Sequence, residues 1–109
     1  MENKPSTFAI LPAEVRYDKR LKPMERLLYA EITCLTHTEG YCYATNKYFA
    51  DLYEVSTDTV SGWISHLVQL NYLRLEIKNR SKRKIYLAIT FSDTSAKNPR
   101  GLGEKSEGG

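Results

Sequence analysis

The sequence has few of the features that mark secreted, membrane-spanning or catalytic proteins. It holds two cysteines, Cys34 and Cys42, whereas a secreted domain of this size usually carries a larger disulfide framework. No apolar run is long enough to span a bilayer, and residues 1–7 are polar. A glycine-rich phosphate loop, a nucleophile elbow and paired carboxylates are also missing. We therefore expect a cytoplasmic protein that contacts no membrane, has no enzymatic activity and needs no cofactor.

A metal site is the one alternative that the cysteines raise. Cys34 and His37 have Cys-x-x-His spacing, and Cys42 follows shortly after them. A structural zinc site needs four ligands, and no fourth ligand is spaced nearby. We therefore expect no bound metal, and we interpret the cysteines as buried thiols and His37 as a residue at the end of a helix.

What the sequence does contain is an uneven distribution of charge. The 109 residues carry a formal net charge of +3, and 41% of them are hydrophobic, enough for the core of one compact domain. Between Arg74 and Lys84 there are six basic residues and a single acid, Glu76. The stretch before it, residues 57–70, carries one full charge, Asp58. We therefore expect one strongly positive face on an otherwise balanced molecule.

Hydrophobic periodicity predicts three helices. The first covers residues 23–38 and begins at a proline, whose missing N–H costs nothing at that position. The second covers residues 46–53 after the capping residue Thr45, and the third covers residues 57–70 after Ser56. Residues at three- and four-residue spacing are expected to be buried. They are Met24, Leu27, Leu28, Ile32 and Leu35 in the first helix, Phe49 and Leu52 in the second, and Val60, Trp63, Ile64, Leu67 and Leu70 in the third.

After residue 71 the hydrophobic period changes from that of a helix to two residues, the period of a strand. Residues 73–78 and 85–91 alternate between apolar and polar side chains, and the polar residues 79–83 connect them. A short strand is also expected at residues 41–43. The order of helix, short strand, helix, helix, strand, strand predicts an α+β fold, a winged helix-turn-helix with a carboxyl-terminal β-hairpin wing. The expected organisation is an amino-terminal arm at 1–22, the domain at 23–91 and a flexible linker or tail at 92–109.

The segment between the second and third helices carries the most specific pattern. Phe49-Ala50 is followed by Val55-Ser56-Thr57-Asp58-Thr59-Val60, with Trp63 three residues further on. A small residue at position 50 and inward-facing residues at 55, 60 and 63 let one helix brace another. The pattern resembles the helix-turn-helix of bacterial and phage DNA-binding domains. Many such motifs have glycine in the turn, where this chain has Glu54; because a glutamate at positive φ costs free energy, we expect a turn of slightly different shape.

The predicted third helix has an outward side that suits the major groove of DNA. Its exposed positions are small and polar, end with Gln69, and include a glycine that would let the backbone approach closely. The basic hairpin would contact phosphates or the minor groove. A solvated helix face and a solubilising hairpin tip are the alternatives. The candidate DNA-binding residues are Thr45, Asn46, Lys47, Ser56, Thr57, Asp58, Thr59, Ser61, Gly62, Ser65, His66, Lys78, Arg80, Lys82, Arg83 and Lys84.

Two further segments carry a resemblance to a known family. Phe8-Ala-Ile-Leu-Pro12 and Leu21-Lys-Pro-Met-Glu-Arg-Leu-Leu-Tyr-Ala-Glu-Ile32, followed by the helix-turn-helix, resemble the amino-terminal domain of plasmid and phage replication initiators and replisome organisers of Gram-positive bacteria. The resemblance covers about Phe8 to Phe91. It implies binding to repeated sites at a replication origin, often as a dimer, and a separate carboxyl-terminal domain that engages replication proteins. It places the recognition helix at Thr57–Gln69 and the wing at Lys78–Lys84.

Other interpretations of the same pattern remain open. The domain could be a transcriptional repressor, or a protein–protein adaptor in a replication complex, because one fold supports several functions. Tyr41, Tyr43 and Tyr48 could stack on single-stranded bases. The apolar arm Phe8–Leu11 must be covered, either by strands of its own chain or by a second copy. We expect a homodimer that pairs on double-stranded DNA through this arm and the first helix.

Overall fold

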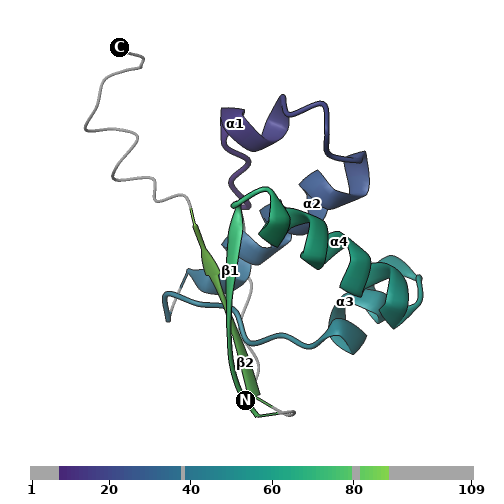
Figure 1. Cartoon of the computed structure of the whole chain (residues 1–109), viewed down its shortest axis with the longest axis vertical. Helices are drawn as coiled ribbons and strands as arrows, with labels where there is room; N and C mark the ends of the chain where they lie inside the picture. Colours follow the sequence, from purple (N-terminus) through teal and green to yellow (C-terminus); the bar gives the residue numbers. More distant parts are fainter. Residues whose placement is uncertain (1–7, 38, 80–81, 89–109) are drawn as a thin grey trace.

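The computed structural model describes residues 8–37, 39–79 and 82–88 and confirms the α+β winged helix-turn-helix fold. The described residues form four helices and a two-stranded antiparallel hairpin, and Figure 1 shows the hairpin beside the helices. The sequence pattern predicts no helix before residue 23, and the structure adds a short one there. Among the described helices, none is long and apolar enough to cross a membrane. The elements are α1 (Ala13–Arg16), α2 (Pro23–Thr36), α3 (Asn46–Tyr53), α4 (Thr57–Gln69), β1 (Leu73–Asn79) and β2 (Lys82–Leu87).

The expected capping residues begin the two helices of the helix-turn-helix. Thr45 Oγ1 accepts a hydrogen bond from the Tyr48 N–H at 3.1 Å, and Ser56 Oγ accepts one from the Thr59 N–H at 3.1 Å. Each cap satisfies a backbone donor that has no partner inside the helix. Glu54 lies between the helices with a φ of 59°, in the left-handed region. The expected avoidance of this conformation is therefore not seen, and the turn carries the strain of a glutamate at a position where many such motifs have glycine.

The core lies between α2, α3, α4 and the inner side of the hairpin. Phe49, Val60 and Leu67 are fully buried, as their spacing predicts. The prediction that Leu27 and Leu52 are buried is wrong, because Leu27 is 48% exposed and Leu52 is 47% exposed. Both belong to an apolar helical stripe, but the stripe is wider than the neighbouring elements that cover it. Periodicity locates the face of a helix, and only tertiary packing shows where its covered part ends.

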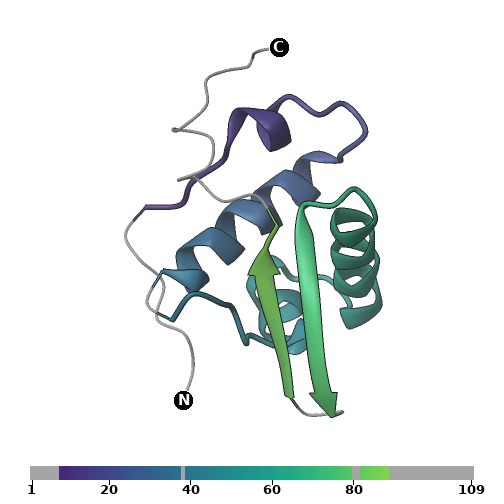
Figure 2. The ribbon, with the colours of Figure 1, turned by 60° about the vertical axis from the view of Figure 1, so that its left-hand side comes forward.

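The hairpin lies against the helices and extends beyond them (Figure 2). Leu73 pairs with Leu87 and Leu75 with Ile85, and an irregularity in register falls between Ile77 and Asn79. Ile85 is fully buried and also pairs with Cys42, which forms the predicted short strand as an isolated bridge. The second strand begins at Lys82, earlier than predicted, and the predicted strand residues 89–91 lie outside the described residues.

The amino-terminal segment is integrated into the domain through α1 and α2. Val15 and Leu21 are buried in the core, although both lie in the segment expected to be an arm. The Ile10 N–H donates to Thr33 Oγ1 at 2.9 Å, and Cys34 Sγ donates to the Phe8 carbonyl at 3.4 Å. The backbone of the arm therefore lies along α2, away from the wing strands. Cys34 and Cys42 are both buried thiols.

Candidate nucleic-acid interface

The outward side of α4 is lined by small polar side chains. Its inward side is anchored by four buried residues, Val60, Trp63, Ile64 and Leu67. This division follows from the 3.6-residue period, and it leaves the other side of the helix to solvent. The exposed residues are those that the sequence predicts: Thr57, Asp58, Thr59, Ser61, Gly62, Ser65 and Gln69. The α4 surface is therefore narrow, hydrophilic and accessible along its whole length.

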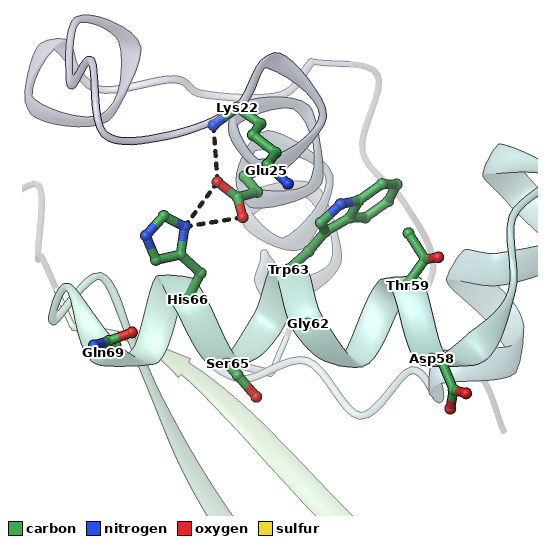
Figure 3. A pocket seen from close by; sticks show the side chains of 9 residues that line it. All are labelled: Lys22, Glu25, Asp58, Thr59, Gly62, Trp63, Ser65, His66 and Gln69. Atoms are coloured by element: carbon green, nitrogen blue, oxygen red, sulfur yellow. Dashed lines mark hydrogen bonds and ion pairs between the residues drawn. The ribbon is translucent and has the colours of Figure 1, made fainter.

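A groove of about 590 Å³, lined mostly by polar residues, runs between this surface and the start of α2 (Figure 3). Figure 3 shows the His66 and Trp63 side chains on the side of α4 that faces α2, and the Ser65 and Asp58 side chains on the other side of α4. The groove brings an element from the helix-turn-helix together with the amino-terminal end of α2. Its lining residues are Lys22, Glu25, Asp58, Thr59, Gly62, Trp63, Ser65, His66 and Gln69.

Glu25 connects the two sides of this groove. Its carboxylate is buried, with 3% of the residue exposed, and it accepts a hydrogen bond from the Lys22 N–H at 2.8 Å. His66 Nδ1 lies 2.9 Å from each of its carboxylate oxygens. Because a buried carboxylate needs partners, this pair fixes α4 against α2. Sequence reasoning missed Glu25, and the available signal was its place as the third residue of a helix, where glutamate caps its own helix start.

His66 is consequently only half-exposed, unlike the rest of the predicted α4 set. Its side chain is 31% exposed and already engaged by Glu25 through Nδ1. The ring therefore helps to position α4 within the domain. The contact spans 41 positions in the chain, so no local pattern could have predicted it.

Gly62 lies in the middle of α4 without a structural requirement for glycine. A Cβ atom added at this position would meet nothing within 4 Å in the described part of the chain. Its φ does not lie in the left-handed region either. Glycine inside a helix costs about 1 kcal/mol relative to alanine. The packing of the described residues does not account for that cost.

Arg83 ties the hairpin to the start of α3. Its guanidinium donates to Asn46 Oδ1 at 2.8 Å and to the Ala44 carbonyl at 2.7 Å. Burial lowers the pKa of this guanidinium from its ordinary value. Arg83 and Asn46 were both predicted to contact DNA, and in this structure they contact each other. The angle of the wing relative to the helix-turn-helix depends on this link.

The other predicted basic residues differ in how far they are engaged. Lys78 and Lys82 are exposed on the hairpin, while Lys84 is half-buried and places Nζ 4.6 Å from the centre of the Tyr41 ring. Lys47 is exposed and pairs with Asp51 at 3.0 Å. Arg80 lies outside the described residues. The wing therefore presents Lys78 and Lys82 to a partner without loss of a described ion pair.

Comparison with known families agrees with this geometry. A model of a helix-turn-helix domain family matches residues 19–73, which is half of the chain and includes α2, the helix-turn-helix and the start of β1. Comparison with curated proteins and with solved structures finds no match. The matched segment ends where the hairpin begins, so the family assignment rests on the helices. With the capped turn at Glu54 and the exposed polar face of α4, the chain belongs to the helix-turn-helix domain family of DNA-binding domains.

Proposed function

We propose that the chain binds a specific site on double-stranded DNA, with α4 in the major groove and the hairpin against the neighbouring backbone. The observation that carries this proposal is the bare, glycine-containing outer face of α4. The major groove is about 12 Å wide and admits a helix. Gly62 would let the backbone of the helix come close to the base edges. That close approach is a reason for a glycine that the fold itself does not require.

The proposed contacts follow from which side chains are exposed. Thr57, Thr59, Ser61 and Ser65 carry hydroxyl groups that bond either to base edges or to phosphates. Because long base-reading side chains are missing from this face, we propose that part of the sequence discrimination is carried by water-mediated contacts. The phosphate contacts would come from Lys78 and Lys82, with Arg80, which lies outside the described residues. Other predicted residues would support the interface by holding α3, α4 and the wing in place. They are Thr45, Ser56, Asn46, His66 and Arg83.

The DNA site is proposed to be a replication origin in the cytoplasm. Support comes from the resemblance of the segments 8–12 and 21–32 to replication initiators and replisome organisers. Footprinting of the protein on the replicon that encodes it tests this directly. Protection of repeated sites in the origin is the expected result. Protection confined to a promoter would contradict the origin proposal and would identify a repressor. A protein that protects no DNA, even at low salt, would contradict DNA binding and would fit an adaptor.

The protein is further proposed to pair with a second copy on DNA through its amino-terminal arm and α2. Phe8 and Ile10 are 80% and 50% exposed, although their backbones are held against α2. Large apolar side chains in such positions favour contact with another surface. Sedimentation with a two-site duplex tests this. We expect a dimer that Phe8→Ser with Ile10→Ser disrupts. A monomer that binds one site as tightly as two adjacent sites would contradict pairing.

A further inference from the structure

The outer face of the hairpin carries a cluster of tyrosines and cations that the duplex-binding proposal does not use. Leu73 and Ile85 are buried on the inner face, so the alternate residues Arg74, Lys84 and Tyr86 lie on the opposite, outer face. The adjacent segment adds to this face, because Cys42 is buried and pairs with Ile85 while its neighbours alternate outward. We name as the tyrosine face the set Tyr41, Tyr43, Arg74, Lys84 and Tyr86.

The members of the tyrosine face are in contact with one another. The Tyr41 ring centre lies 6.0 Å from that of Tyr43 and 5.9 Å from that of Tyr86, with the rings tilted by 53° and 52°. The Arg74 guanidinium lies 4.2 Å from the Tyr86 ring centre, and Lys84 Nζ lies 4.6 Å from that of Tyr41. The rings and the cations therefore form one continuous surface across three neighbouring segments of chain.

The charge of this surface is positive. Arg74 and Lys84 contribute two cations, and Lys82 falls on the same side of β2 by alternation. The acid on this side is Glu76, which lies opposite Lys84 in the strand register and accepts a hydrogen bond from the Tyr86 hydroxyl at 3.3 Å. Its charge is therefore partly compensated within the cluster. The tyrosine face is complementary to a polyanion that also carries flat apolar groups.

We propose that the tyrosine face binds single-stranded DNA. Unpaired bases stack on aromatic rings while nearby cations neutralise the phosphates, and this combination is common to proteins that bind single strands. Duplex DNA fits less well, because its bases are already stacked on one another and would leave the three rings without a stacking partner. An acidic peptide would use the cations and leave three adjacent rings without a role. The inner side of the hairpin packs on the core that α4 also lines, and the tyrosine face lies on the opposite side of the hairpin, so one molecule has room for duplex at α4 and a single strand at the hairpin.

The direct test is fluorescence anisotropy of a labelled oligothymidine strand, which cannot form a duplex, titrated with the full chain. We expect salt-dependent binding. Tyr86→Leu, which keeps the bulk of the side chain and removes the ring, should weaken the affinity about fivefold or more. Tyr86→Phe keeps the ring and should bind like the wild type. Arg74→Gln, at an exposed position, should also weaken binding and reduce its dependence on salt.

Ser61→Glu on α4 is the matched control, because it alters the duplex surface and leaves the hairpin unchanged. We expect it to lose duplex binding and keep oligothymidine binding. Three results would overturn the proposal: no binding of the strand by the wild type, equal binding by Tyr86→Leu and Arg74→Gln, or equal loss with Ser61→Glu, which would place the single strand at α4. The proposal is independent of the duplex function, because failure of duplex binding alone would leave the oligothymidine result intact. Thermal melting of each variant verifies that it is folded.

Discussion

Asp18 fixes the amino-terminal segment to the hairpin through a small set of hydrogen bonds. Its Oδ1 accepts from the N–H and Nε of Arg20, both at 2.9 Å, and its Oδ2 accepts from the Tyr72 hydroxyl at 2.7 Å. The hydrogen bonds from Arg20 and Tyr72 hold the pKa of this carboxyl well below its ordinary value of 3.8. A carboxyl whose pKa is lower in the folded protein than in the unfolded chain stabilises the folded state at every pH above the unfolded-state pKa. This stabilisation is lost as the pH falls from the unfolded-state pKa through the folded-state pKa.

The first prediction concerns Asp18→Asn. At neutral pH the variant should have a lower free energy of unfolding than the wild type, because the amide cannot replace the charged acceptor. The difference should shrink as the pH falls below about 4, where the wild-type carboxyl of the unfolded chain becomes protonated. Urea unfolding midpoints at a series of pH values measure this. Asp51→Asn, in an exposed pair with Lys47, is the control and should show little effect. A difference that is constant with pH would contradict the account.

The second prediction separates Arg83 from its exposed neighbour. Arg83→Ala removes both donors from the Ala44 carbonyl and Asn46 Oδ1, so it should lower the free energy of unfolding by about 1–3 kcal/mol. Lys82→Ala is exposed and should stay within about 0.5 kcal/mol of the wild type. Chemical unfolding measures both. If Arg83→Ala were as stable as Lys82→Ala, the arginine would not hold the wing.

At the scale of the element, substitutions on the two faces of α4 should have different effects: those on the outer face should change DNA binding, and those on the buried face should change stability. The third prediction is that Ser61→Glu abolishes duplex binding with little change in melting temperature, because the position is exposed. Ile64→Ala, on the buried face, should cost about 2–5 kcal/mol and lose binding only through unfolding. Gel shifts and thermal melts on the same preparations distinguish the two. A collapse of the fold in Ser61→Glu would mean that the face assignment is inverted.

The fourth prediction is that Gly62→Ala changes stability and binding in opposite directions. Alanine is the better helix former, and the added Cβ meets nothing in the described residues, so stability should rise by about 0.5–1 kcal/mol. The same methyl group should lower the affinity for duplex DNA, because it holds the helix away from the base edges. Melting curves and duplex titrations give the two values. An alanine variant that binds as tightly as the wild type would show that the backbone of α4 stays away from DNA.

The elements that local pattern could predict are those with a clear period or cap. The face of α4 and the caps Thr45 and Ser56 follow from nearby residues, whereas the left-handed φ of Glu54 differs from the expected change in turn shape. The short helix α1 could not be predicted, because four residues carry no period. Contacts between distant segments were also out of reach, as Glu25 with His66 and Arg83 with Asn46 show. Those contacts give three of the predicted DNA-contacting residues, Asn46, His66 and Arg83, partners within the domain.

At the scale of the whole molecule, the helices and the hairpin present two separate surfaces. The inner side of the hairpin packs on the core that α4 also lines, so the tyrosine face and the outer face of α4 point in different directions. Figure 1 shows this arrangement, with the hairpin on one side of the molecule and α3 and α4 on the other. Duplex DNA and a single strand would then contact separate residues except at Lys82 on the wing, which lies within reach of both surfaces.

The measurement that tests the central claim most directly is an NMR titration. The isotope-labelled chain is titrated with a duplex that contains the site found by footprinting, and the amide chemical shifts are recorded at each step. The account predicts that the largest changes fall on the outer face of α4, at Thr57, Ser61, Gly62 and Ser65, with smaller changes at Lys82 on the wing. An unrelated duplex should shift the wing and leave α4 nearly unchanged. If the specific duplex bound tightly while the α4 amides stayed in place, α4 would not be the DNA-reading element and the central claim would be wrong.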